Sequence, residues 1–279
     1  MWVKGALSDM DLLLRRCEIA AEAAKRAGAY LKGEFAKSRP SGIRYKGKID
    51  IVTDCDIEAQ RVAIDTLRSG FPSDVVLAEE SNNNGPRPEV SDYWIVDPLD
   101  GTNNFSRGIP HFCVSIAFVS RHEIALGVVY APILDELYSS VRSRGATLNG
   151  LTIHVSRTTH LREAIIASGF PYDLMGPQGD NLSQWSALVK RVRAPRCAGA
   201  AALDLCYVAC GRYDAHWESD LEPWDMAAGA IMVTEAGGEV TSTLGEAFDP
   251  FRRSVLATNQ VLHSDMLALL SSSPADPVK

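Results

Sequence analysis

The segment WIVDPLDGTNNF, at residues 94–105, places two acidic residues directly after a short apolar run. Such a run is typical of a buried strand, so Asp97 and Asp100 would lie at the carboxyl end of that strand. One interpretation is a plain turn, because Pro, Asp and Gly are the usual turn residues. The other is a cation site, in which the carboxylates hold Mg²⁺ and the N–H groups that follow face a phosphate. The rest of the chain must decide between them.

Size and charge narrow the class of protein. The 279 residues, 46% of them hydrophobic, are enough for one large core or two fused lobes. A net charge of -7 without a long Lys/Arg cluster argues against nucleic acid or an anionic membrane as the main partner. An acidic protein can still bind phosphate where a bound cation reverses the local field.

The chain start and the cysteines predict a soluble, cytoplasmic protein. The segment MWVKGALSDM lacks an apolar signal core, and no run approaches the ~18 apolar residues of a membrane span. The six cysteines include no CxxC pair and no zinc spacing completed by histidine. Cys206 and Cys210 could face each other on a helix, but we interpret them as small buried thiols. This pattern fits a reducing compartment.

Periodic patterns predict alternating helices and strands. Residues 9–37 carry a helical apolar stripe, and a second helix follows a cap at Thr53 or Asp54 and ends near Gly70. The predicted strands are VVLAEES, YWIVD, FCVSIAFV, IALGVVYAP, ELYSSVR, AIIASGF and YDAHWE. The later predicted helices are NLSQWSALVKRV, AGAAALDLCYVACG and EPWDMAAGAIMVTEAGG. Without an internal repeat or linker, we expect one layered α+β domain over residues 1–270 and a disordered tail over 271–279.

Acidic residues gather where predicted strands end and where a late helix begins. Glu79 ends one strand, Asp97 and Asp100 end the next, and Asp225 lies just inside the helix. Pro223 suits the first turn of that helix, and an isolated Asp225 there would be interpreted as a residue favoured by the helix dipole. Charged groups at such places are costly unless they are paired or bound to a metal. Together they favour the cation site over the plain turn.

Five blocks of the sequence resemble, in order and spacing, those of the inositol monophosphatase family: DIVTDCD, AEES, WIVDPLDGTNNF, RGATLNG and WESDLEPWDMAAGAIMVTEAGG. The resemblance spans about residues 9–265. The family consists of Mg²⁺-dependent, lithium-sensitive phosphatases. The resemblance implies a layered α/β/α/β/α sandwich of the sugar-phosphatase type, two or three Mg²⁺ ions, a small phosphate monoester as substrate and a homodimer.

The resemblance also implies roles for individual residues. The matching metal ligands are Glu79, Asp97, the backbone carbonyl of Leu99, Asp100 and Asp225. The pair that orients the attacking water is Thr102 and Asp56. The substrate-binding set comprises the phosphate-facing N–H groups of Gly101 and Thr102, the adjacent Asn103, the sugar-pocket residues Gly199, Ala200 and Ala201, and Glu218, which contacts a substrate hydroxyl.

Four positions depart from the family pattern: Asn103, Ala200, Asp220 and Glu222. Threonine is common at the first two, and glycine and a basic or neutral residue are usual at the last two. If the two extra acids face the pocket, they favour a cationic leaving group such as histidinol. The alternatives are a subunit contact or exposure to solvent. Lys46 or Lys48 either matches a family lysine near the third metal or is a solvated loop residue.

The expected activity is Mg²⁺-dependent hydrolysis of inositol monophosphate or a similar polyol phosphate by an activated water. No phosphoenzyme is expected, because no Ser, Cys or His stands in a comparable arrangement. Alternative substrates are histidinol phosphate, fructose 1,6-bisphosphate, another sugar phosphate and a 3'-phosphorylated nucleotide. A binding module on the same fold is the other alternative, and the intact acidic set argues against it.

Overall fold

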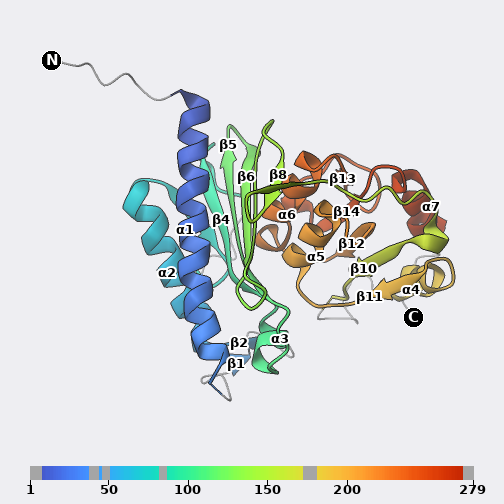
Figure 1. Cartoon of the computed structure of the whole chain (residues 1–279), viewed down its shortest axis with the longest axis horizontal. Helices are drawn as coiled ribbons and strands as arrows, with labels where there is room; N and C mark the ends of the chain where they lie inside the picture. The colour runs from blue at the N-terminus through green and yellow to red at the C-terminus, as the bar shows by residue number, and fades with distance from the viewer. Residues whose placement is uncertain (1–7, 38–43, 46–50, 82–86, 172–180, 273–279) are drawn as a thin grey trace.

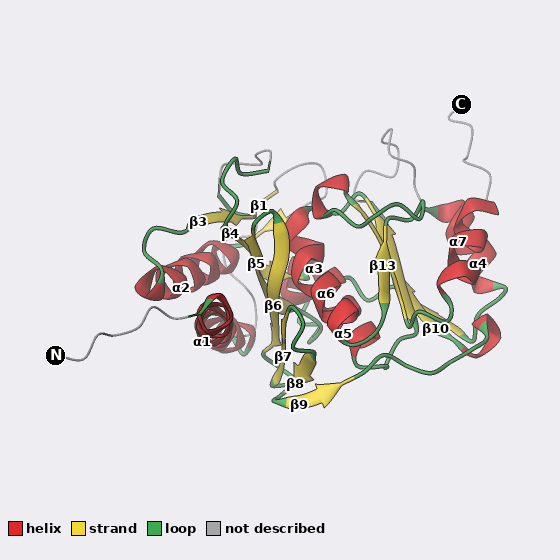
Figure 2. Ribbon diagram, turned by 90° about the horizontal axis from the view of Figure 1, so that it is seen from above, coloured by secondary structure: helices red, strands yellow, loops and turns green. Residues whose placement is uncertain are grey.

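The computed structural model describes residues 8–37, 44–45, 51–81, 87–171 and 181–272. Its elements form five layers in the order helices, sheet, helices, sheet, helices (Figures 1 and 2). The outer pair α1 (Asp9–Phe35) and α2 (Asp54–Gly70) covers a seven-stranded sheet. Helices α5 (Ala201–Ala209) and α6 (Pro223–Glu235) separate it from a five-stranded sheet, which α4 (Leu182–Val189) and α7 (His263–Ser272) cover. The predicted α/β/α/β/α sandwich is confirmed.

The seven-stranded sheet has the order β3-β4-β5-β6-β7-β8-β9. Strand β3 runs parallel to β4, and every later neighbouring pair is antiparallel. The bounds are β3 Val75–Ala78, β4 Tyr93–Asp100, β5 Cys113–Ser120, β6 Glu123–Ala131, β7 Glu136–Val141, β8 Ala146–Leu148 and β9 Leu151–Ile153. Both faces of β4 to β6 are covered by helices, so their residues are almost all buried, as the apolar runs predicted.

A β-bulge interrupts β4 at the acidic segment. Asp97 lies opposite Ser115 and Asp100 opposite Cys113, so three steps along β4 correspond to two along β5. Residues three apart on a regular strand point to opposite faces. The extra residue shifts this alternation, and Pro98 at the irregular point has no N–H to lose from the ladder. The bulge therefore allows both carboxylates to face the same cleft.

The first helical layer follows the predicted patterns closely. The buried stripe of α1 consists mainly of alanine, which lets the helix approach the sheet, and α1 begins at a capping box of Ser8 and Asp11. Helix α2 begins at a second capping box, in which the N-cap is Thr53 and Asp56 is the third helical residue. The predicted cap at Thr53 is confirmed, and Gly70 is the last helical residue.

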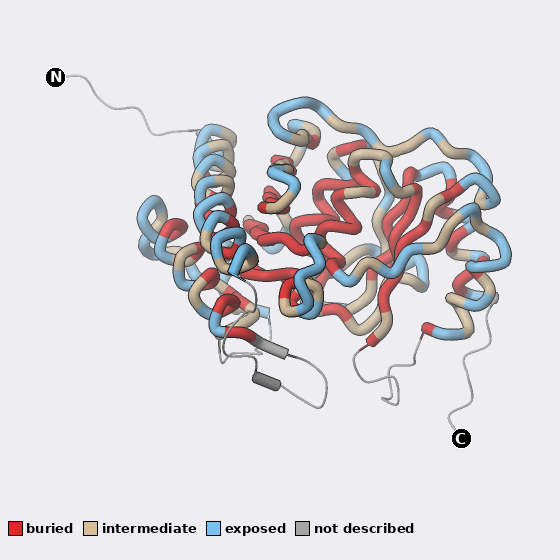
Figure 3. The backbone as a smooth tube through the Cα atoms, turned by 60° about the horizontal axis from the view of Figure 1, so that its bottom comes forward, coloured by how far each residue is buried: buried red, intermediate tan, exposed pale blue. Residues whose placement is uncertain are grey.

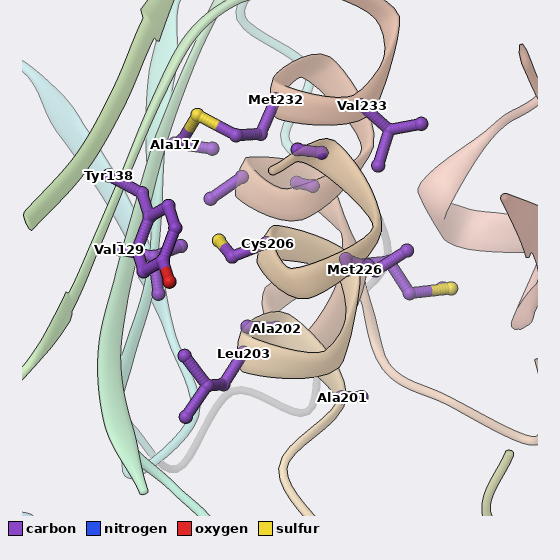
Figure 4. Close-up of a cluster of buried hydrophobic side chains, with 14 of the residues drawn as sticks. Ala117, Val129, Tyr138, Ala201, Ala202, Leu203, Cys206, Met226, Met232 and Val233 are labelled. Carbon is purple, nitrogen blue, oxygen red and sulfur yellow. The ribbon is translucent and has the colours of Figure 1, made fainter. Parts of the chain in front are cut away.

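The middle helices are buried on nearly every side (Figure 3). In Figure 4, Cys206 of α5 points toward Val129 and Tyr138 of the first sheet, whereas Met226 of α6 points away from that sheet. Small residues allow this close packing, since a Cβ at Gly229 of α6 would overlap Leu205 of α5. A layer between two sheets has no solvent face, which explains the apolar sequence of both helices.

The five-stranded sheet has the order β11-β10-β12-β14-β13, in which β10 is parallel to β11 and β12, and β14 is antiparallel to β12 and β13. Its strands are β10 Ile165–Ser168, β11 Ala194–Arg196, β12 Ala215–Ser219, β13 Glu239–Thr241 and β14 Ser254–Thr258. The sequence patterns did not predict β8, β9, β11, β13, β14 or α7. Helix α7 includes the first two residues of the expected tail at 271–279, and the other seven lie outside the described residues.

The remaining short elements are β1 Arg44–Tyr45, β2 Ile51–Val52, α3 Thr102–Ser106 and two 3₁₀ turns, Leu161–Glu163 and Pro250–Arg252. None of the described helices is long and apolar enough to cross a bilayer. The six cysteines are free thiols, of which Cys55, Cys113 and Cys206 are buried. Cys210 is partly buried and Cys197 is exposed.

Candidate active site

A cleft of about 520 Å³ opens where the end of β4, the start of α5, the end of β12 and the start of α6 meet. Every predicted site residue lines it except Asp56, which is fully buried beneath Thr102. The lining residues from the predicted set are Glu79, Asp97, Leu99, Asp100, Gly101, Thr102, Asn103, Gly199, Ala200, Ala201, Glu218 and Asp225. The fold thus brings together residues that lie up to 146 positions apart, from Glu79 to Asp225.

Backbone N–H groups hold one oxygen of each aspartate in the cleft. Leu99 N donates to Asp97 Oδ1 at 2.9 Å, and Ala202 N at the start of α5 donates to Asp100 Oδ2 at 2.9 Å. Glu222 N donates to Asp225 Oδ2 at 2.8 Å, which completes the capping box of α6. These bonds fix the direction of each carboxylate and leave its second oxygen for another partner.

The carboxylates raise one another's proton affinity. Burial, followed by the charges of Glu79, Asp100 and Asp225, raises the pKa of Asp97 well above its usual range. Burial, Asp100 and Glu79 do the same for the pKa of Asp225. Burial raises the pKa of Asp100 to about 6, although the N–H of Ala202 opposes this shift. Several acids that disfavour each other's ionised form make a site whose charge a divalent cation would neutralise.

The donor set fits a hard cation. All of the side chains are carboxylates, and the Leu99 carbonyl lies among them, which suits Mg²⁺ rather than a soft metal. Within the described ranges, no three His, Cys, Asp or Glu side chains are placed so that they could together hold a metal ion. Mg²⁺ usually keeps several waters and takes only one or two carboxylates, so an open group of oxygens at a cleft is compatible with it.

Thr102 and Asp56 form a buried pair at the cleft wall. The hydroxyl of Thr102 donates to Asp56 Oδ1 at 2.9 Å, with the carbonyl of Leu99 as an alternative acceptor at 3.1 Å. The other oxygen of Asp56 accepts from Thr53 N at 2.8 Å in the capping box. The start of α2 therefore orients the carboxylate that contacts Thr102.

The turn after β4 requires glycine. Gly101 has a φ of +96°, and a Cβ there would lie 3.0 Å from the carbonyl oxygen of His111. The short helix α3 follows, and Asn104, which the sequence analysis did not single out, ties it to the start of α5. Its Nδ2 donates to the carbonyls of His111 and Ala198, each at 2.8 Å. Its place inside the WIVDPLDGTNNF motif was the only signal that could have found it.

Glu218 occupies a space that only glycine leaves open. Its carboxylate packs against Gly169, where a Cβ would overlap it, and its side chain is 13% exposed at the cleft. Burial, then the charges of Asp204, Asp225 and Asp100, raises the pKa of Glu218 well above its usual range. The carboxylate therefore has a fixed place in the part of the cleft beyond Gly199 to Ala201.

The two extra acids line the cleft near its opening, here called the mouth, and one arginine pairs with both and partly compensates their charge. Arg253 contacts Asp220 Oδ1 through Nη2 at 2.7 Å and Glu222 through Nη1. Asp220 and Arg253 both have positive φ, of 67° and 56°, and Asp220 N donates to the Arg253 carbonyl at 2.7 Å. Of the positions left open by the sequence, the structure places both acids at the cleft lining, and no sequence signal indicated Arg253. Lys46 and Lys48 lie outside the described residues.

Five alternating layers with a carboxylate-lined cleft across the middle layer define a protein of sugar-phosphatase architecture. The chain matches the model of the inositol monophosphatase family over residues 14–275. It is 38% identical over 258 residues to the inositol-1-monophosphatase of Synechocystis, covering 92% of this chain and 89% of that protein. The chain belongs to the inositol monophosphatase family.

Solved structures share its fold. The structure of the extragenic suppressor protein SuhB from Bartonella henselae has a TM-score of 0.85 and 37% identity, covering 91% of this chain and 98% of that one. An IMPase/NADP phosphatase complexed with Mg²⁺ and phosphate has a TM-score of 0.81 and 25% identity, covering 95% of this chain and 98% of that one. These likenesses extend over nearly the whole chain.

Proposed function

We propose that this protein is a Mg²⁺-dependent phosphomonoesterase that hydrolyses inositol monophosphate or a similar polyol phosphate. The observation that carries the proposal is the convergence of four acidic side chains and the Thr102–Asp56 pair on one cleft. The names of the relatives support the substrate, and the Mg²⁺ and phosphate in a similar structure support the cofactor.

In this proposal the cation ligands are Glu79, Asp97, the carbonyl of Leu99, Asp100 and Asp225. Their support is the shared cleft, the mutual elevation of their proton affinities and the backbone bonds that orient three of them. Bound Mg²⁺, as two or three ions, would neutralise developing charge on the phosphate oxygens and make a water more acidic. In this proposal the residues hold the ions, and the raised pKa values of Asp97 and Asp225 support a site that a cation would stabilise.

The remaining residues act directly on the substrate and the attacking water. Thr102 donates to Asp56. As a water beside the phosphate gives a proton to the Thr102 oxygen, the hydroxyl proton of Thr102 would pass to Asp56, which then holds it. The N–H groups of Gly101 and Thr102, with Asn103 beside them, face the phosphate at the turn. Glu218 accepts a hydrogen bond from a hydroxyl of the leaving group, above the sugar-pocket residues Gly199, Ala200 and Ala201.

Arg253 favours a neutral polyol over a cationic leaving group. Because the guanidinium already pairs with Asp220 and Glu222, these acids do not present two uncompensated charges to the substrate. Histidinol phosphate thereby loses the attraction that would have made it the preferred alternative. Fructose 1,6-bisphosphate and 3'-phosphonucleotides remain alternative substrates that the same cleft chemistry would hydrolyse.

A phosphate-release assay on the metal-free protein tests the proposal. Inositol 1-phosphate, histidinol phosphate, fructose 1,6-bisphosphate and a 3'-phosphonucleotide should be compared with chelator and with added Mg²⁺. We expect turnover only with Mg²⁺ and the highest kcat/KM for inositol 1-phosphate. Full activity in chelator would refute the metal dependence, and a higher kcat/KM for another substrate would replace the polyol.

Family resemblance extends the proposal to three further properties. These are a homodimer, inhibition by lithium and a cytoplasmic location, all for one catalytic domain over residues 1–270. Sedimentation of the purified protein and lithium titration of the Mg²⁺-dependent activity test the first two.

A further inference from the structure

A row of buried polar side chains runs behind Glu218, away from the cation ligands. His111 Nε2 lies 3.4 Å from Asp204 Oδ1, and Asp204 Oδ2 lies 3.9 Å from His216 Nδ1. On the other side of the imidazole, His216 Nε2 lies 3.6 Å from Glu218 Oε2. The row thus joins the loop before β5 to the residue that we place at the substrate hydroxyl.

Strand alternation explains why His216 supports Glu218. The two residues are separated by one position on β12, so both point to the face that α5 covers. Trp217 between them points to the opposite face, where it packs in the cluster formed with α4 and α7. Asp204 lies in the first turn of α5, directly after the sugar-pocket residues at 199–201.

The polar atoms of this row are poorly satisfied. His216 is fully buried, and among the described residues neither of its nitrogens has a partner within hydrogen-bond distance. Asp204 Oδ1 and His111 Nε2, although 3.4 Å apart, also make no hydrogen bond among the described residues. A buried polar group without a hydrogen bond costs about 1–3 kcal/mol. An apolar side chain at position 216 would avoid that cost, so the imidazole points to a role other than stability.

We propose that His216 is a positioning residue that orients the carboxylate of Glu218 toward a hydroxyl of the leaving group, with Asp204 holding the far side of the ring. This inference rests on the proposed function, because it deepens the role given there to Glu218. A neutral imidazole carries one N–H, and Asp204 is the acceptor beside Nδ1. In the proposed arrangement Nε2 accepts from a protonated Glu218, whose other oxygen accepts from the substrate, and both contacts close from the 3.9 and 3.6 Å separations of this structure.

The protonation states of the two groups agree with this arrangement. Burial lowers the pKa of His216, so the ring is neutral, and burial with the nearby acids raises the pKa of Glu218. Gly169 closes the other side of the carboxylate, so the imidazole and the glycine together restrict its rotation. His216 therefore determines how well the cleft distinguishes hydroxylated leaving groups from plain ones.

The test compares inositol 1-phosphate with phenyl phosphate, whose leaving group has no additional hydroxyl. The variants are His216→Phe, which removes the polar ring, and His216→Gln, which keeps an acceptor. The measured quantity is kcat/KM for inositol 1-phosphate divided by kcat/KM for phenyl phosphate. We expect His216→Phe to lower this ratio about tenfold, which corresponds to one lost hydrogen bond. Most of the change should be a higher KM for inositol 1-phosphate. His216→Gln should restore part of that ratio.

Two controls separate positioning from stability. Trp217→Phe, on the opposite face of β12, should lower Tm without changing the ratio. In a Glu218→Gln background, His216→Phe should cause no further loss, because the two residues act through one contact. An unchanged ratio in His216→Phe, or an additive loss in the double variant, would overturn the inference. If His216→Phe does not fold, the same ratio is measured in His216→Gln and Asp204→Asn. An unchanged ratio in both variants would then overturn the inference.

The same assay keeps the two proposals apart. A wild-type protein that shows no Mg²⁺-dependent preference for inositol 1-phosphate over phenyl phosphate contradicts the proposed function. A wild-type preference that survives His216→Phe contradicts only the positioning role.

Discussion

Two groups of acidic side chains in the cleft are compensated in opposite ways. Asp97, Asp100 and Asp225, here called the phosphate end, are held by backbone N–H groups, and burial with neighbouring carboxylates raises their pKa values. At the mouth, Asp220 and Glu222 share the guanidinium of Arg253. Among the described residues no guanidinium pairs with the first group, for which the proposed function supplies a cation from solution, whereas the second group pairs with an arginine of the chain.

In the proposed function, the acids of the phosphate end serve catalysis, and those of the mouth affect which leaving group is recognised. In the proposed function Mg²⁺ relieves the repulsion at the phosphate end, and this part of the site would then be arranged for the charged state that forms with the substrate. The partly compensated mouth reduces the electrostatic preference among leaving groups, and in the proposed function Glu218 then selects by hydrogen bonds. The predictions below test each end separately.

Removing one anion from the phosphate end should have the largest effect. Asp97→Asn or Asp225→Asn should lower kcat by about a hundredfold or more at ordinary Mg²⁺, because each removes an anionic cation ligand. The protein should stay folded, and its Tm in chelator should be equal or higher because repulsion is relieved. Asp65→Asn, at an exposed ion pair with Arg61, is the matched control. Near-normal kcat in either variant would remove that residue from the ligand set.

The second largest effect on kcat should come from removing the Thr102 hydroxyl. Thr102→Val keeps the shape of the side chain but cannot accept a proton, so kcat should fall about a hundredfold, within the range for proton transfer. Thr102→Ser should keep most of the activity. Mg²⁺ affinity, measured by calorimetry, should change little in both variants. A loss of Mg²⁺ binding that explains the lower kcat would show instead that Thr102 supports the cation site.

Acid should stabilise the metal-free protein. The pKa of Asp100 is about 6 in the folded state, compared with about 3.9 in an unfolded chain, so the folded state binds more protons between these values. The free energy of unfolding therefore falls as pH rises through this window, by about 1 kcal/mol between pH 5 and pH 7 for this group. Denaturant titrations in chelator measure it.

The control for this pH effect comes from the other end of the cleft. Asp100→Asn should flatten the dependence, Asp220→Asn should not, and Mg²⁺ at pH 7 should restore stability by binding the folded state. A stability in chelator that rises from pH 5 to pH 7 would contradict the raised pKa of Asp100, which burial and the charge of Asp204 cause.

The smallest effect should come from the mouth. Arg253→Ala leaves Asp220 and Glu222 without their guanidinium. The kcat/KM for histidinol phosphate relative to that for inositol 1-phosphate should therefore rise a few-fold. This rise corresponds to about 1 kcal/mol or less of charge interaction, because the groups are partly exposed. Arg253→Lys should keep the wild-type ratio, and Glu222→Lys should move it the opposite way. An unchanged ratio in Arg253→Ala would place the selection of leaving groups entirely elsewhere in the cleft.

Local patterns in the sequence determined much of this protein. The alanine-rich stripe of α1, the Thr53 cap of α2 and the strand ending at Asp97 follow from side-chain periodicity and backbone chemistry within about one helical turn or strand. The resemblance of five blocks to one family correctly indicated the layered fold and the residues that meet in the cleft. Short edge elements such as β11 and β13, three residues each, carried too little pattern to be predicted.

Only the tertiary structure decided the contacts between distant segments. The charge at the mouth depends on Arg253, 33 residues from Asp220, and the support for α3 depends on Asn104 reaching a carbonyl 94 residues away. Likewise, β12 places His216 behind Glu218, but only the packing of α5 brings Asp204 to its other side. No local periodicity specifies such pairs, because each forms only when separate layers close on one another.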